Sequence, residues 1–129
     1  MKFAVDTHAL VWHLAEDRRL SRRAGKLLGQ CESGASTAHV STIVLMEISM
    51  LEALGRIIGS YPELRDQLER RPGFVIEPLT AEDVDEARSL AKLHDPFDRM
   101  IAGTSIRLGL PLLTRDATMT EDPRIDTIW

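Results

Sequence analysis

The first stretch of the chain, residues 2–12 (KFAVDTHALVW), constrains the fold most strongly. Residues 3–5 form a short apolar run that ends at Asp6, and a second apolar run begins at Ala9. A brief apolar run of this kind predicts a buried strand, and the residues from His8 onward predict a helix just after it. Asp6 would then lie at the carboxyl end of a central strand, which is the edge where open α/β sheets bind ligands.

The remaining chain alternates between predicted strands and predicted helices. Further strands are expected at residues 37–41, 74–77, 111–114 and 126–129, and further helices at residues 20–30, 43–54, 63–70, 81–93 and 96–109. This alternation predicts an α/β/α sandwich, with a central, mostly parallel sheet of four to five strands and helices on both faces. Since no repeat or linker interrupts the pattern, residues 1–129 are expected to form a single domain.

Composition narrows the class of protein. The 43% hydrophobic and 28% charged fractions are typical of a globular domain, and no apolar run is long enough for a membrane span. The single Cys31 excludes an internal disulfide framework and a cysteine-rich zinc site, which favours a cytoplasmic protein. The net charge of −4 means that any nucleic-acid contact has to be local, and the basic run at residues 18–26 is otherwise a solvated helix face.

Four acidic residues stand at positions that suggest chemistry: Asp6, Glu47, Asp98 and Asp116. Asp116 follows a predicted strand as Asp6 does, so both would lie at the same sheet edge, although either could simply cap a helix or turn. Glu47 has only apolar neighbours three and four positions away, which predicts that it projects from the buried face of its helix. Such a carboxylate is costly unless it is protonated, paired with an arginine or bound to a metal ion.

Asp95 and Asp98 stand three positions apart at a predicted helix start. Asp95 is the expected cap, with Pro96 at the first helical position, and Asp98 lies in the first turn. Both could be purely structural, or Asp98 could turn inward toward the sheet edge.

Four carboxylates in one crevice repel one another, so some must take up protons or bind cations. An all-oxygen set selects hard ions such as Mg²⁺ or Mn²⁺, which in pairs activate water for phosphodiester cleavage. The four histidines contain no i, i+4 pair of the kind that binds zinc.

Four segments, in this order and spacing, resemble the PIN domain of VapC-type toxin ribonucleases. They are VDTHALVW with Asp6, STIVLMEI with Glu47, HDPFDRMIAGTS with Asp98, and LPLLTRDATM with Asp116, followed by a terminal TIW. The resemblance implies Mg²⁺- or Mn²⁺-dependent cleavage of RNA, a cognate antitoxin partner and a homodimer, with Asp6, Glu47, Asp98 and Asp116 as catalytic and metal-binding residues. Asp95 could assist from outside this set. Met100 and Gly103 stand where relatives often have Leu and a longer polar residue, which we expect to have no effect on the chemistry.

Three other functions also suit parts of the pattern. A haloacid-dehalogenase-like phosphatase needs a second Asp two residues after the first, where this chain has His8. A response-regulator receiver domain needs a late lysine, and none follows Lys92. A non-catalytic acidic interaction module is the remaining alternative.

Overall fold

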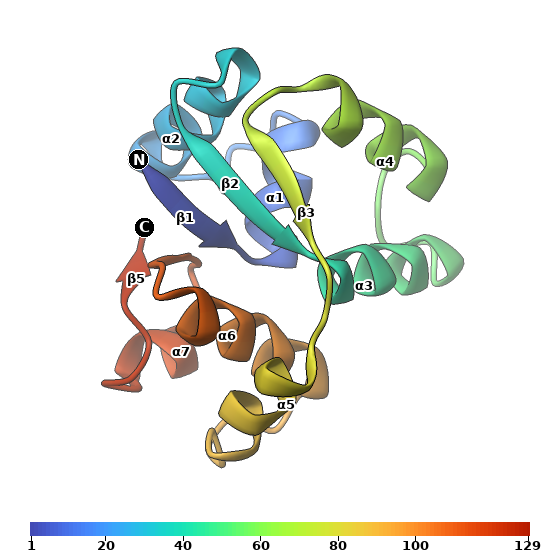
Figure 1. Cartoon of the computed structure of the whole chain (residues 1–129). Coiled ribbons are helices and arrows are strands. Elements are labelled where there is room, and N and C mark those ends of the chain that lie inside the picture. The colour runs from blue at the N-terminus through green and yellow to red at the C-terminus, as the bar shows by residue number, and fades with distance from the viewer.

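A computed structural model describes the whole chain, Met1–Trp129 (Figure 1). One sheet of five strands has the order β3-β2-β1-β4-β5, and every neighbouring pair is parallel. The strands are β1 (Lys2–Val5), β2 (Thr37–Ser41), β3 (Phe74–Glu77), β4 (Leu112–Leu113) and β5 (Thr127–Ile128). The parallel α/β sheet expected from the alternating pattern is therefore confirmed.

Seven helices connect these strands and cover the sheet. They are α1 (Thr7–Leu14), α2 (Arg22–Ser33), α3 (Thr42–Ala53), α4 (Tyr61–Arg70), α5 (Ala81–Arg88), α6 (Pro96–Leu108) and α7 (Ala117–Glu121). Figure 1 shows α5, α6 and α7 gathered on one side of the sheet and α1, α2 and α4 on the other, which confirms the sandwich. None of these helices has the length and apolar character that crossing a membrane requires.

β1 is the centre of the core. Phe3, Ala4 and Val5 are at most 3% exposed, since helices cover both faces of the strand and neighbouring strands flank it. A strand buried on both faces has a continuous apolar run rather than an alternating one, which is the pattern of residues 3–5.

The structure differs from the sequence prediction at two helices, α5 and α7. The helix expected over residues 81–93 ends at Arg88, and Leu90 and Leu93 are buried in the turns that follow it. Their burial explains why the apolar spacing looked helical beyond the true end. The sequence pattern also missed α7, a helix of five residues that is too short to show a period.

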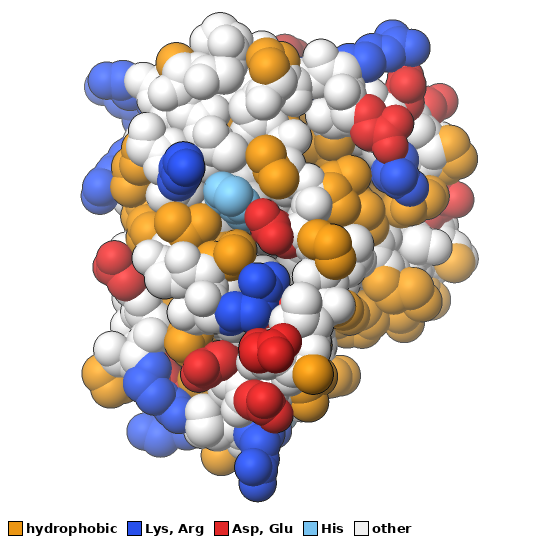
Figure 2. All heavy atoms as spheres, viewed as in Figure 1, with side chains coloured by type: hydrophobic (Ala, Val, Ile, Leu, Met, Phe, Trp, Pro, Cys, Tyr) orange, Lys and Arg blue, Asp and Glu red, His pale blue; other side chains and the backbone are white.

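The predicted buried face of α3 is wrong in part. Of the four apolar neighbours of Glu47, Val44 is buried, Ile43 and Leu51 are partly buried, and Met50 is 42% exposed. Met46, beside Glu47, is 53% exposed. α3 extends away from the carboxyl end of β2, so its outer part has no sheet to cover (Figure 1). Hydrophobic side chains accordingly gather on the surface over α3 and α4 (Figure 2).

Gly103 determines how closely α5 and α6 approach each other. A Cβ atom at this position would lie 2.5 Å from the Asp83 carbonyl oxygen and 3.2 Å from the Ala87 Cβ. The Asp83 carboxylate is fully buried and forms an ion pair with Arg107 of α6, with Oδ1 and Nε 2.5 Å apart. This contact fixes the helix that carries Asp98 against its neighbour.

Candidate active site

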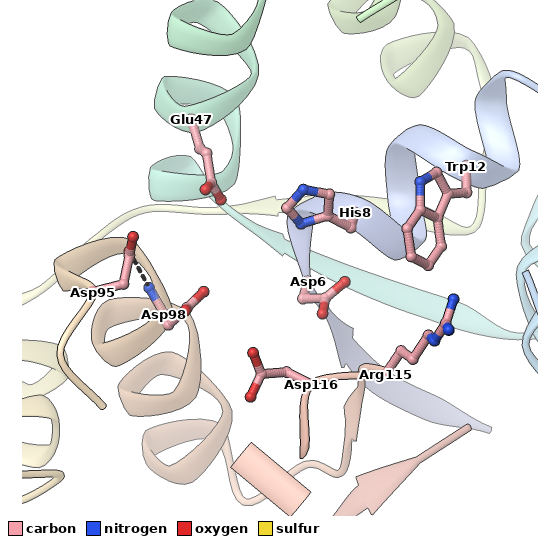
Figure 3. Close-up of a pocket in the computed structure, with 8 residues that line it drawn as sticks. All are labelled: Asp6, His8, Trp12, Glu47, Asp95, Asp98, Arg115 and Asp116. Carbon is pink, nitrogen blue, oxygen red and sulfur yellow. Dashed lines mark hydrogen bonds between the residues drawn. The ribbon is translucent and has the colours of Figure 1, made fainter. Parts of the chain in front are cut away.

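A cavity of about 380 Å³ lies at the carboxyl ends of β1 and β4 (Figure 3). Eight residues line it: Asp6, His8, Trp12, Glu47, Asp95, Asp98, Arg115 and Asp116. All four carboxylates singled out in the sequence are in this group, although they come from four separate segments of the chain. The fold thus gathers Asp6, Glu47, Asp98 and Asp116 around one space.

Asp6 has both a structural contact and a place in the cavity. Its Oδ1 accepts a hydrogen bond of 2.8 Å from the Ala9 backbone N–H, so it caps α1. Its Oδ2 accepts a hydrogen bond from the Thr114 hydroxyl. The side chain is nearly buried, and this burial raises the pKa of Asp6 despite the two hydrogen bonds that lower it.

Asp116 reaches the cavity from the neighbouring strand. β1 and β4 run parallel with Val5 opposite Leu113, so the segments after both strands meet at one edge. The Asp116 Oδ1 accepts a 2.9 Å hydrogen bond from the Met119 N–H and thereby caps α7. The structure therefore gives Asp116, like Asp6, the capping contact that was its alternative interpretation.

Asp95 and Asp98 take different positions at the start of α6. Asp95 is the cap, because its Oδ1 accepts from the N–H groups of Phe97 and Asp98 at 2.8 and 3.2 Å. Asp98 is free of this task and lines the cavity (Figure 3). Burial and, after it, the negative charges of the other cavity acids, Asp95 most among them, together raise the pKa of Asp98 to about 7.

Glu47 points toward the cavity from α3 (Figure 3). It is partly exposed at the cavity rim rather than sunk in the core, which corrects the expectation of a buried face. No salt bridge joins it to an arginine, so the structural alternative of a buried ion pair does not hold.

Two cavity residues, Trp12 and Arg115, were missed by the sequence reasoning. The guanidinium carbon of Arg115 lies 5.9 Å from the centroid of the Trp12 ring, and the His8 and Trp12 ring centroids are 5.8 Å apart. Only their positions in the sequence could have indicated a role: Trp12 lies in the helix that Asp6 caps, and Arg115 directly precedes Asp116. The structure also places His8 in the cavity wall.

The donor chemistry of the cavity suits a hard divalent cation. The acids supply only oxygen ligands, and the negative charges of the other four acids add to the effect of burial in raising the pKa of Asp98. No three Asp, Glu, His or Cys side chains are close enough together in this structure to form a complete metal site. The residues therefore fit such an ion by type and by location, and side-chain rotation would have to complete the ligand set.

The sequence matches the family model of the PIN domain over residues 3–121. Among curated proteins, none shows significant similarity to the chain.

Several solved structures share the fold. A crystal structure of VapBC2 from Rickettsia felis bound to a promoter DNA fragment has a TM-score of 0.71 at 15% identity, over 99% of this chain and 98% of that one. A toxin-antitoxin complex from Klebsiella pneumoniae has a TM-score of 0.67 at 19% identity, over 98% of this chain and 96% of that one. The crystal structure of FitAcB from Neisseria gonorrhoeae has a TM-score of 0.68 at 18% identity, over 100% of this chain and 97% of that one. These likenesses extend along essentially the entire chain.

Proposed function

The chain belongs to the PIN domain family, and from this premise we propose that it is a divalent-metal-dependent endoribonuclease of the VapC toxin type. The proposed catalytic and metal-binding residues are Asp6, Glu47, Asp98 and Asp116. One observation supports this assignment above the others: acids from four segments face a single cavity, and their combined charge and burial raise the pKa of Asp98 to about 7. A carboxylate in this setting is stabilised by a bound cation.

The proposed cofactor is Mg²⁺ or Mn²⁺, held by Asp6, Glu47, Asp98 and Asp116. When bound, such an ion would supply an activated water and stabilise the negative charge that develops on the phosphodiester. The protein's own part is to hold the ligands in place. Asp6 is fixed by the Ala9 N–H and the Thr114 hydroxyl, and Asp95 fixes the first turn of α6 from which Asp98 projects.

The proposed partners are RNA, a cognate antitoxin and a second copy of the chain. Toxin-antitoxin complexes are among the structures of similar fold, which supports the antitoxin. Large apolar side chains exposed on and after α3 support a protein partner: Met46, Met50, Leu54 and Ile58. With RNA as substrate and no membrane-spanning helix, we place the activity in the cytoplasm.

The test is cleavage of total cellular RNA by the purified, antitoxin-free protein with Mg²⁺ or Mn²⁺. Asp98→Asn should lose more activity than the roughly 10–100-fold that follows loss of a residue outside the ligand set. The matched control, Asp85→Asn, removes an exposed acid of α5 that does not line the cavity and should cleave normally. Circular dichroism should show both variants folded.

Undiminished cleavage in excess chelator, or by Asp98→Asn, would contradict the proposal. A non-catalytic acidic interaction module would cleave no RNA with either ion, and a receiver domain would instead take up phosphate from acetyl phosphate.

A further inference from the structure

The cavity contains one cation that forms no ion pair. Arg115 is the only lysine or arginine among the eight lining residues, and its side chain is exposed. No salt bridge or hydrogen bond joins its guanidinium to any of the five acids around it, whereas six other arginines of the chain are paired with carboxylates. The geometry of the cavity rim explains why Arg115 does not pair with these acids.

Local geometry and Trp12 together hold Arg115 away from the acids. Asp116 has an extended backbone, and the side chains of Arg115 and Asp116 point to opposite sides of the chain (Figure 3). The Arg115 guanidinium lies 5.9 Å from the Trp12 ring centroid, within the range of a cation–π contact. The ring itself is held edge-on by Trp129, whose ring centroid is 6.0 Å away. The guanidinium is thus oriented at the rim with its N–H donors unused.

We propose that Arg115 binds a backbone phosphate of the RNA next to the phosphate that is cleaved, and that Trp12 is its positioning residue. This inference rests on the proposed nuclease function. A guanidinium presents five donors in a planar fork that matches phosphate oxygens. The chain as a whole has a net charge of −4, so it offers no general attraction for RNA, and a free cation at the cavity rim offsets the repulsion locally.

Trp12 is assigned to positioning rather than to stacking on a base. The guanidinium carbon of Arg19 also lies over the ring, 4.8 Å from its centroid, and Arg19 is paired with Asp17. With two guanidinium groups and Trp129 around it, the indole is already in use as a platform for cations.

The first experiment compares Arg115→Gln, Arg115→Lys and the control Arg88→Gln. Arg88 is exposed on α5, makes no salt bridge and does not line the cavity, so its substitution removes the same charge elsewhere. On an RNA oligonucleotide that the wild type cleaves, Arg115→Gln should raise KM about tenfold, the effect of one lost charge-assisted contact, with kcat nearly unchanged. Arg115→Lys should recover part of the loss, and Arg88→Gln should match the wild type.

The second experiment measures binding without cleavage. In an Asp98→Asn background, the affinity for a mixed-sequence single-stranded RNA is followed against salt concentration by fluorescence anisotropy. Removing one phosphate contact should lower the slope of log affinity against log salt by about 0.7 for Arg115→Gln. Arg88→Gln should leave the slope unchanged.

The role of Trp12 is tested by a double-mutant cycle. Trp12→Leu should raise KM as Arg115→Gln does, and the double variant should be little worse than either single one, since both remove the same contact. Trp12→Phe keeps an aromatic face and should restore most of the affinity, which a loss of packing alone would not do.

An unchanged KM and salt slope for Arg115→Gln, in a wild type that cleaves RNA, would overturn the inference while leaving the proposed function intact. A loss confined to kcat would also overturn it, because Arg115 would then act on the cleaved phosphate itself. Failure of the wild type to cleave RNA would instead defeat the proposed function, and the salt slope would still decide whether Arg115 contacts phosphate.

Discussion

The Thr114 hydroxyl donates a hydrogen bond to the Asp6 carboxylate, which joins the ends of β1 and β4 beneath the cavity. The same hydroxyl oxygen accepts the backbone N–H of Asp116 at 3.0 Å. Thr114 is 1% exposed, so one buried side chain holds both of the acids that follow the two strands. Because water cannot replace this contact, the loss of the hydroxyl has a measurable cost.

Thr114→Val should therefore lower the free energy of unfolding by about 1–3 kcal/mol, the cost of leaving a buried acceptor without a partner. It should also raise the pKa of Asp6 further, because the Thr114 hydrogen bond lowers it. Urea unfolding measures the first effect. Thr118→Val is the control, since Thr118 is exposed and makes no side-chain hydrogen bond. Equal stability of the two variants would show that the contact contributes nothing.

Gly103→Ala and Gly29→Ala should have opposite effects, although both glycines lie inside helices. A Cβ at Gly29 would meet nothing within 4 Å, so alanine should raise the free energy of unfolding by up to about 1 kcal/mol through helix propensity. A Cβ at Gly103 would lie 2.5 Å from the Asp83 carbonyl oxygen, and backbone cannot yield as a flexible side chain does. Overpacking costs about 1–3 kcal/mol, so Gly103→Ala should be net destabilising.

Urea unfolding of the two alanine variants gives the comparison directly. A stabilising Gly103→Ala would mean that α5 and α6 separate freely.

The elements that could be predicted from the sequence are those determined by neighbours in the chain. The apolar run at residues 3–5 and the Asp95–Pro96 helix start both act within a few residues, and the structure has both as expected. The end of α5 was not predictable in this way, because Leu90 and Leu93 continue the helical spacing while the backbone has already turned. Burial in the core, not local propensity, explains their apolar character.

The candidate site shows the same division. Three cavity acids could be listed from their positions after strands and at a helix start, namely Asp6, Asp116 and Asp98, and the parallel register of β1 and β4 brings the first two together. Glu47 was singled out by apolar neighbours, although it lies partly exposed at the rim. Trp12 contacts Arg115 and Trp129, which are more than a hundred positions away in the chain, so no local sequence pattern could predict these contacts. The double task of Asp6 was also beyond the sequence, which offered capping and the cavity as alternatives.

The pKa of Asp98 predicts a pH dependence of stability. Its pKa rises from 3.8 to about 7 on folding, so between these values the folded protein holds a proton that the unfolded chain has released. The contribution of Asp98 to the free energy of unfolding is therefore largest below about pH 4 and is lost as the pH rises to about 7. At about pH 8, Asp98→Asn should have a free energy of unfolding about 1–2 kcal/mol above that of the wild type, because it removes the cost of ionising Asp98, part of which solvent screens. At about pH 4 the two proteins should differ little.

Urea unfolding at the two pH values, with Asp85→Asn in parallel, separates this effect from the titration of other acids. A gain for Asp98→Asn that is the same at both pH values would show that Asp98 titrates near its ordinary pKa.

Binding of the proposed ion should stabilise the protein, and more strongly at high pH. A ligand at a hundredfold excess over its Kd adds about 2.7 kcal/mol to the free energy of unfolding, which raises Tm by several degrees. Because the ion needs the ionised carboxylate, it competes with the proton that Asp98 holds below about pH 7. The rise in Tm with Mn²⁺ or Mg²⁺ should thus be larger at about pH 8 than at about pH 6.

Differential scanning calorimetry with and without each ion measures this linkage without any RNA. Asp98→Asn should lose most of the ion-dependent rise, and Asp85→Asn should keep it, because only the first removes a proposed ligand. An identical rise in all three proteins would place the ion elsewhere on the surface. No rise at saturating ion, in a protein that nonetheless cleaves RNA, would mean that the ion joins the site only together with the substrate phosphate.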